Sequence, residues 1–188
     1  IVLCLVGSEM CIRDSNNAGH GIQINSVSGD IIPLIIGLNG NDPITGESLG
    51  NTITNNAADG IEINSGGFVQ INNNLIATNG GSGVDINAIA VGVRAALLQN
   101  NSIQNNGEDG IEFQNFLNST DVGFLIGFGN SITGNQSRGI DILNQGSAVA
   151  NIRLGDGTAA NANTISGNVE EGIYVVNTAS LTETQAPM

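Results

Sequence analysis

The sequence has no lysine and no tryptophan, few aromatic residues and only three prolines. Its lysine and arginine total is four against seventeen acidic residues, which gives a formal net charge of −13. Nucleic acids and anionic lipids are bound through basic patches, so this balance excludes both as partners. No apolar run approaches the roughly 18 residues that a membrane-spanning helix needs. The composition therefore predicts a folded, acidic protein with an aliphatic core.

Cysteine occurs only at positions 4 and 11, within an opening stretch that differs from everything after it. A secretory signal would need a basic start and a longer apolar run than this stretch contains. The string LVGSEMCIRDS, from Leu5 to Ser15, resembles one reading frame of a transposase-type sequencing adapter. We therefore predict that residues 1–15 derive from an adapter and that residues 16–188 form a single domain.

One pattern recurs along the rest of the chain: N-x-I-x-x-N-x-x-x-G-I-x-I, with other apolar residues sometimes replacing isoleucine. A partial copy ends at Ile24, and full copies begin at Asn51, Asn74, Asn101, Asn130 and Asn163. The glycines of successive copies lie 23 to 39 residues apart. A fixed block joined by spacers of variable length is typical of a repeat protein whose insertions lie in loops.

The block predicts short β-strands. In G-I-x-I the isoleucines alternate with a polar residue, so the apolar and polar side chains point to opposite faces. The N-x-I segment gives a second strand, and the glycine allows an unusual backbone angle or a close approach between the two. No segment has a convincing helical period, and even AIAVGVRAALLQ (Ala88 to Gln99) favours strand. Strands that recur once per block predict parallel coils stacked about 4.8 Å apart.

Stacking places equivalent residues of successive blocks beside one another. Two aliphatic ladders follow, one of Ile53, Ile76, Ile103, Ile132 and Ile165, the other of Ile22, Ile61, Val84, Ile111, Ile140 and Ile173. Asparagine tolerates the left-handed backbone conformation of a turn, and its amide can bond to the amide of the next coil. The second asparagine of each block is therefore expected to form an amide ladder at a turn: Asn56, Asn79, Asn106, Asn135 and Asn168.

These blocks, from Asn16 to about Asn177, resemble the right-handed parallel β-helix repeats of the pectin-lyase-like superfamily. The glycine-rich approaches to the block, such as LGNTIT at Leu49 and FGNSIT at Phe128, are similar to repeats of large bacterial secreted or surface proteins. The resemblance implies an all-β, right-handed parallel β-helix of about six coils and a secreted or cell-surface location. Since no capping element is recognisable, we expect an uncapped fragment that continues into further coils of the same protein.

The polar residue of G-I-x-I is expected to form a column on the outer face, reading Gln23, Glu62, Asp85, Glu112, Asp141 and Tyr174. Neighbouring carboxylates about 5 Å apart repel each other by roughly 3 kcal/mol at an effective dielectric constant near 20. One hypothesis is a saccharide- or Ca²⁺-binding face built from Glu62, Asp85, Glu112, Asp141 and Asp109, with Ca²⁺ at Glu112, Asp141 and Asp109. The alternative is a solvated acidic face that binds nothing.

An enzymatic alternative follows from the resemblance, because lyases, hydrolases and epimerases occur in this superfamily. Arg138, near Asp141, is a candidate base of the lyase kind. His20, in Gly19-His20-Gly21, resembles the G-H-G element of polygalacturonases. The N-T-D, paired Asp-Asp and R-I-K elements of that family do not occur in this sequence, and neither does the D-P-x-D motif of the alginate epimerases.

The leading hypothesis is therefore non-enzymatic: a structural or adhesin-like extracellular segment that needs no cofactor apart from a potential Ca²⁺ ion. Its partners would be polysaccharides or ligands on a host or cell surface. The long connections Pro33–Leu49 and Phe116–Phe128 are the expected places for contacts with such a ligand, although they contain no recognisable motif.

Overall fold

A computed structural model describes residues 13–25, 34–38, 40–41, 46, 48–64, 68–88, 95–115, 125–144, 153–155 and 157–178. These residues form seventeen short β-strands and a single turn of 3-10 helix, η1 (Ala159–Asn161). Every pairing between the strands is parallel. The prediction of an all-β protein built from parallel strands is confirmed for this part of the chain.

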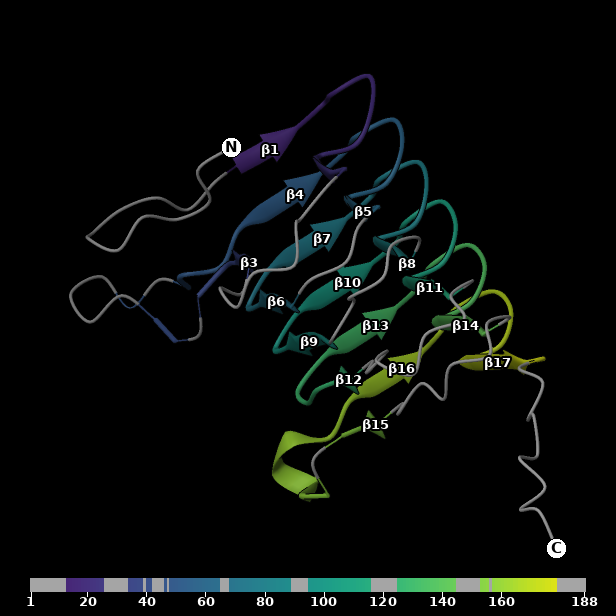
Figure 1. Cartoon of the computed structure of the whole chain (residues 1–188). Helices are drawn as coiled ribbons and strands as arrows, with labels where there is room; N and C mark the ends of the chain where they lie inside the picture. The colour runs from purple at the N-terminus through teal and green to yellow at the C-terminus, as the bar shows by residue number, and fades with distance from the viewer. Residues whose placement is uncertain are drawn as a thin grey trace, which may run out of the picture.

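The strands belong to three parallel sheets, and the chain visits the sheets in turn (Figure 1). Sheet 1 contains β1 (Arg13–Ser15), β4 (Thr52–Thr54), β7 (Leu75–Ala77), β10 (Ser102–Gln104), β13 (Ser131–Thr133) and β16 (Thr164–Ser166). Sheet 2 contains β2 (Ile22–Ile24), β5 (Ile61–Ile63), β8 (Val84–Ala88), β11 (Ile111–Asn115), β14 (Ile140–Asn144) and β17 (Ile173–Asn177). Sheet 3 contains β3 (Leu34–Ile36), β6 (Phe68–Asn72), β9 (Ala95–Gln99), β12 (Leu125–Ile126) and β15 (Arg153–Leu154). We call one passage of the chain through the three sheets a round.

The register of sheets 1 and 2 confirms both predicted aliphatic ladders, except that Ile173, at the end of the second one, is exposed rather than buried. In sheet 1, Ile103 pairs with Ile76 on one side and with Ile132 on the other. In sheet 2, Ile111 pairs in the same way with Val84 and Ile140. These side chains are fully buried. Because each buried aliphatic side chain contributes roughly 1.5–3 kcal/mol, the ladders supply a large part of the apolar stabilisation of the stack.

Sheet 3 adds a third wall of the core that the repeat does not predict. Ile36 pairs with Ile71, which pairs with Leu98, and all three side chains are fully buried. The expected connections Pro33–Leu49 and Phe116–Phe128 therefore contain strands β3 and β12, and much of their remainder lies outside the described residues. The strand expected in Ala88–Gln99 is confirmed at β9, whereas residues 89–94 also lie outside the described part.

Two columns of buried asparagines hold successive rounds together. In the predicted ladder, the amide nitrogen of Asn106 donates to Oδ1 of Asn135 at 3.0 Å, and Asn79 donates to Asn106 in the same way. A second ladder, which was not predicted, runs through the first asparagine of each block: Asn51, Asn74, Asn101, Asn130 and Asn163. In both ladders Oδ1 also accepts a backbone N–H from the neighbouring round, so the side chain replaces a backbone partner at each turn.

The expectation that the ladder asparagines themselves adopt a left-handed conformation is wrong by one residue. Positive φ angles occur immediately before the ladder, at Asn55, Thr78, Asn105, Gly134 and Gly167. The chain bends at these positions, and the next asparagine then directs its amide into the interior of the stack. The bend is therefore separated from the hydrogen-bonding residue, which keeps an ordinary backbone conformation.

The strand β1 lies within the stretch that resembles an adapter. Asp14 pairs with Ile53 and so occupies the position that isoleucine holds in the rest of sheet 1. Both carboxylate oxygens of Asp14 accept hydrogen bonds from the Asn17 amide at 3.0 Å. A carboxylate in place of a core isoleucine agrees with an origin of this stretch outside the repeat, which stays a prediction.

Among the described residues, no helix combines the length and hydrophobicity needed to cross a bilayer.

Candidate functional site

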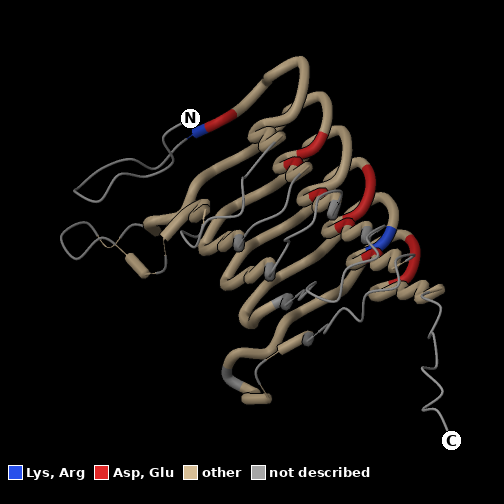
Figure 2. Tube along the Cα trace, viewed as in Figure 1, with Lys and Arg blue, Asp and Glu red and all other residues tan. Residues whose placement is uncertain are grey.

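The polar residues of sheet 2 form the predicted outer column. Register pairs join Gln23 to Glu62, Glu62 to Asp85, Asp85 to Glu112 and Glu112 to Asp141, and Asp141 pairs with Tyr174. Figure 2 shows acidic positions recurring along this edge from one round to the next. The sequence-predicted residues Glu62, Asp85, Glu112 and Asp141 thus lie in one row, about 4.8 Å apart along the sheet.

A second column runs beside the first, at the residue that precedes the glycine of each block. Asp109 belongs to this column, which reads His20, Asp59, Ser82, Asp109, Arg138 and Glu171. We call the two columns together the acidic strip. Carboxylates alternate with other side chains in the second column, so each acid there is flanked by residues that can donate hydrogen bonds.

The aspartates of the second column are fixed by backbone N–H groups of the following round. Oδ1 of Asp59 accepts the N–H of Ser82, and Oδ1 of Asp109 accepts the N–H of Arg138, each at 2.7 Å. Asp109 is buried. These are short, charge-assisted hydrogen bonds that hold the carboxylates in one orientation. Sequence reasoning placed Asp109 near the strip but gave no sign of this turn-to-turn bond.

Among the described residues, the carboxylates of the first column are bonded by side chains and not by the backbone. The Asn87 amide donates to Oδ2 of Asp85 at 2.8 Å, and the Gln114 amide donates to Glu112. Oδ1 of Asp85 and Oδ1 of Asp141 are buried and have no hydrogen-bond partner among the residues that the structure describes. A buried carboxylate oxygen without a partner is uncommon in proteins, and each case calls for a bound proton, water or ion.

Burial and mutual repulsion raise the pKa values of the central acids. Burial, followed by the charge of Glu112, raises the pKa of Asp85 from 3.8 to about 7. Burial is also the main cause of the raised pKa of Glu112, to which Asp109 and Asp141 add. Burial raises the pKa of Asp141 as well, although the nearby Arg138 acts in the opposite direction. The middle of the acidic strip therefore favours protons, or another source of positive charge.

We expect Asp85→Asn to stabilise the protein above neutral pH. The folded-state pKa of about 7 exceeds the ordinary value of 3.8, so the folded state binds this proton more tightly. Stability that depends on the proton is present at low pH and lost as the pH rises from about 4 to about 7. At pH 8 the free energy of unfolding of the variant should exceed that of the wild type by roughly 1–2 kcal/mol, a range that allows for screening by solvent. At pH 4 the two proteins should differ little.

Urea denaturation at pH 4, 6 and 8 measures this difference. Glu108→Gln serves as the control, because it removes an acid from an exposed turn beside the strip. A gain for Asp85→Asn that is equal at all three pH values would contradict the assignment of the effect to the Asp85 proton.

Arg138 is held among carboxylates at the far end of the strip. Its guanidinium contacts Asp141 at 2.8 Å, Glu171 at 3.0 Å and Glu170 at 3.5 Å, and it lies 4.1 Å from the centroid of the Tyr174 ring. Burial acts to lower the pKa of Arg138, but hydrogen bonds to Glu171 and Asp141 and the charges of Asp141 and Glu170 outweigh burial and raise it. This arrangement favours the protonated form of Arg138, which then acts as a counter-ion of the strip; a role as a base stays a prediction.

His20, the other candidate, lies at the opposite end of the strip, between two carboxylates of the next round. Nδ1 lies 3.1 Å from Oδ2 of Asp59, and Nε2 lies 3.4 Å from Oε2 of Glu62. The meeting of these three residues was not predicted, because His20 was considered only as part of Gly19-His20-Gly21. The repeat could have predicted the contact between His20 and Asp59, because each of the two residues directly precedes the glycine of its block.

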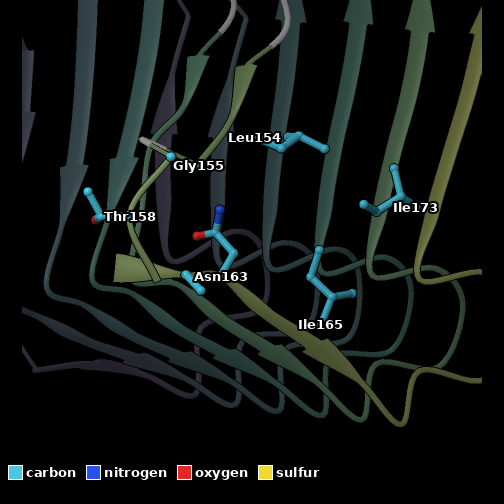
Figure 3. Close-up of a pocket in the computed structure, with 8 residues that line it drawn as sticks. Leu154, Gly155, Thr158, Asn163, Ile165 and Ile173 are labelled. Carbon is cyan, nitrogen blue, oxygen red and sulfur yellow. The ribbon is translucent and has the colours of Figure 1, made fainter. Parts of the chain in front are cut away.

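A hollow of about 360 Å³ lies away from the strip, beside β15, η1, β16 and β17 (Figure 3). Leu154, Ile165 and Ile173 line it together with Gly155, Gly157, Thr158, Ala162 and Asn163. Ligand sites combine an apolar lining with a few convergent polar groups. No charged side chain is found among these lining residues, so we place the candidate site at the acidic strip.

Comparisons with protein-family models, with curated proteins and with solved structures give no match to this chain.

Proposed function

We propose that residues 16–188 are a right-handed parallel β-helix of about six coils, related to the pectin-lyase-like superfamily. In this proposal the chain is a non-enzymatic, structural or adhesin-like segment of a bacterial secreted or cell-surface protein. The acidic strip is its binding face, for Ca²⁺ and for ligands such as polysaccharides.

One observation carries the structural part of the proposal: the two asparagine ladders continue through successive rounds without interruption. Ladder amides within the stack bond to the round on either side, and the same contacts recur from one round to the next. Repeat proteins of this kind derive their stability from neighbouring repeats and form stiff, elongated units. A stiff unit suits a segment that holds other parts of a protein at a distance.

The acidic strip supports a role for Ca²⁺. Glu112 pairs in register with Asp141, and Asp109 lies close enough to raise the pKa of Glu112. Hard cations such as Ca²⁺ take clustered carboxylate oxygens as ligands. A cation between Glu112 and Asp141 would relieve their mutual repulsion and would give the buried Oδ1 of Asp141 a partner. Binding by Asp109 as well requires the three side chains to move closer together, because among the described residues only His20, Asp59 and Glu62 bring three donor atoms within 4.8 Å of one another.

We expect calorimetric titration to detect Ca²⁺ binding with a dissociation constant of roughly 10⁻⁴–10⁻³ M, as in extracellular modules. Saturating Ca²⁺ should raise the melting temperature by a few degrees, and a chelator should reverse the rise. Asp109→Asn combined with Glu112→Gln should abolish both effects. Glu108→Gln is the matched control: it removes an exposed acid from the same turn whose charge contributes less to the pKa of Glu112 than those of Asp109 and Asp141, and it should change both effects far less than the double variant.

Two outcomes would contradict the proposal. Absence of both binding heat and a melting shift would leave the strip as a solvated acidic face. The non-enzymatic assignment would be overturned if the protein released unsaturated products from uronic-acid polysaccharides and if Arg138→Ala abolished that release.

A further inference from the structure

The ring of His20 lies against two carboxylates that come from a single turn of the next round. The backbone N–H of Asp59 donates to Nδ1 at 3.3 Å, while Oδ2 of Asp59 lies 3.1 Å from the same nitrogen. Nε2 faces Oε2 of Glu62 at 3.4 Å. One donor atom from each of the three residues can be chosen so that all lie within 4.8 Å of one another.

We propose that His20, Asp59 and Glu62 form a binding site for a divalent transition-metal ion, with Zn²⁺ as the probe of choice. Zn²⁺ binds imidazole nitrogen and carboxylate oxygen at about 2.0–2.2 Å, which places neighbouring ligand atoms about 3.3 Å apart. The distance of 3.4 Å between Nε2 of His20 and Oε2 of Glu62 is close to that spacing. Asp59 approaches the other ring nitrogen, and a donor atom of each of the three residues lies within 4.8 Å of the other two. Three protein ligands leave a position for water or for a ligand atom.

The three side chains are oriented by groups outside the trio. Oδ1 of Asp59 is occupied by the N–H of Ser82, which leaves Oδ2 directed at His20. The Gln23 amide donates to Oε2 of Glu62 at 2.5 Å and fixes that carboxylate. If Nε2 of His20 binds the ion, Nδ1 carries the proton and faces Oδ2 of Asp59, so the Asp59 carboxylate orients the ring as well as lying within reach of the ion.

The site is partly buried and accessible. The exposed fractions of the side chains are 23% for His20, 14% for Asp59 and 15% for Glu62. An ion can therefore reach the trio from solvent, whereas partial burial strengthens its attraction to the two carboxylates. The imidazole distinguishes this site from the Ca²⁺ region of the strip, because nitrogen ligands suit Zn²⁺, Ni²⁺ and Cu²⁺ and oxygen ligands suit Ca²⁺.

The chain contains an internal control for the role of the imidazole. The sequence DGIE occurs at residues 59–62 and again at residues 109–112. Relative to Asp109 and Glu112, Ser82 occupies the place that His20 occupies relative to Asp59 and Glu62. The Ser82 hydroxyl reaches Oε2 of Glu112 at 3.4 Å. The same pair of carboxylates is thus presented twice, once with an imidazole and once with a hydroxyl.

The test is calorimetric titration of the whole chain, with any histidine tag removed, using Zn²⁺ in a buffer that does not bind metals. We expect one Zn²⁺ ion per chain at pH 7.5. His20→Ala and Asp59→Asn should each weaken binding by at least about 10-fold. Asp109→Asn combined with Glu112→Gln should leave Zn²⁺ affinity unchanged while it abolishes Ca²⁺ binding, so failure of one proposal is distinguishable from failure of the other.

Nuclear magnetic resonance supplies an independent readout, because the sequence contains a single histidine. Zn²⁺ should shift the imidazole resonances of His20, and paramagnetic Co²⁺ should broaden them, in proportion to occupancy. Thermal melts establish that each variant is folded. The proposal is overturned if the wild type binds no Zn²⁺, if His20→Ala binds Zn²⁺ as tightly as the wild type, or if the imidazole resonances do not respond.

Discussion

Asn106→Ala is expected to lower the free energy of unfolding by about 3 kcal/mol or more. Asn106 is fully buried, and its Oδ1 accepts both the backbone N–H and the side-chain amide of Asn79. Its own amide donates to Oδ1 of Asn135 and to the carbonyl oxygen of Ile76. Truncation leaves the Asn79 N–H buried without its partner, and one such group costs about 1–3 kcal/mol. The cavity left by the amide adds to that cost.

The neighbouring Asn105 provides a matched control. Asn105 is exposed and has a φ angle of 55°, a conformation that glycine adopts freely. Asn105→Gly should therefore change stability by less than about 1 kcal/mol. Urea denaturation followed by circular dichroism compares the two variants with the wild type. Equal midpoints for Asn106→Ala and Asn105→Gly would refute the view that the buried ladder stabilises the stack.

The two aliphatic ladders and the ladder of the second asparagines were predicted from the sequence, because their residues repeat at fixed offsets. In a stack of parallel strands, residues at equal offsets in successive blocks become neighbours, however long the spacers between the blocks are. Ile103 and Ile132 share such an offset, and so do Glu112 and Asp141. The acidic row therefore followed from the same argument as the core.

Sheet 3 could not be predicted in this way. Its strands lie in the spacers, where the distance from the preceding block changes from round to round. Leu34–Ile36, Phe68–Asn72 and Leu125–Ile126 have different lengths and no shared motif. These strands share only apolar side chains at alternate positions, a pattern that occurs in many short segments. Their register is determined by hydrogen bonding to neighbouring rounds, a long-range effect.

The partners of the strip were also beyond the sequence argument. The bond from the Arg138 N–H to Asp109 depends on the path of the turn, and so does the approach of His20 to Asp59 and Glu62. A count of charges predicts repulsion along the strip, but the relief of that repulsion depends on where each turn directs its N–H groups. The offset between glycines identifies which turns meet, and only the structure gives the distances.

Gly110→Ala is the second substitution with a large expected effect, a loss of about 3 kcal/mol or more. A Cβ atom on Gly110 would lie 2.4 Å from Cγ2 of Ile132, 2.6 Å from the carbonyl oxygen of Gly139 and 2.8 Å from Nδ2 of Asn135. All three distances are far below van der Waals contact. To remove these clashes, the aliphatic ladder, the asparagine ladder and the backbone of the next round would all have to move together. Overpacking of an interior usually costs about 1–3 kcal/mol, and the rigid neighbours here place the change at or above that range.

Gly19→Ala is the matched control, because no atom outside its chain neighbours lies within 4 Å of the position of its Cβ. Replacing a glycine where space and backbone angles permit usually stabilises a protein by about 0.4–1 kcal/mol, since the unfolded chain loses freedom. Gly110→Ala should therefore lower the urea midpoint, whereas Gly19→Ala should raise it slightly or leave it unchanged. A Gly110→Ala protein as stable as the wild type would mean that successive rounds are not in close contact at this glycine. The turn between sheets 1 and 2 would then be looser than the distances around Gly110 require.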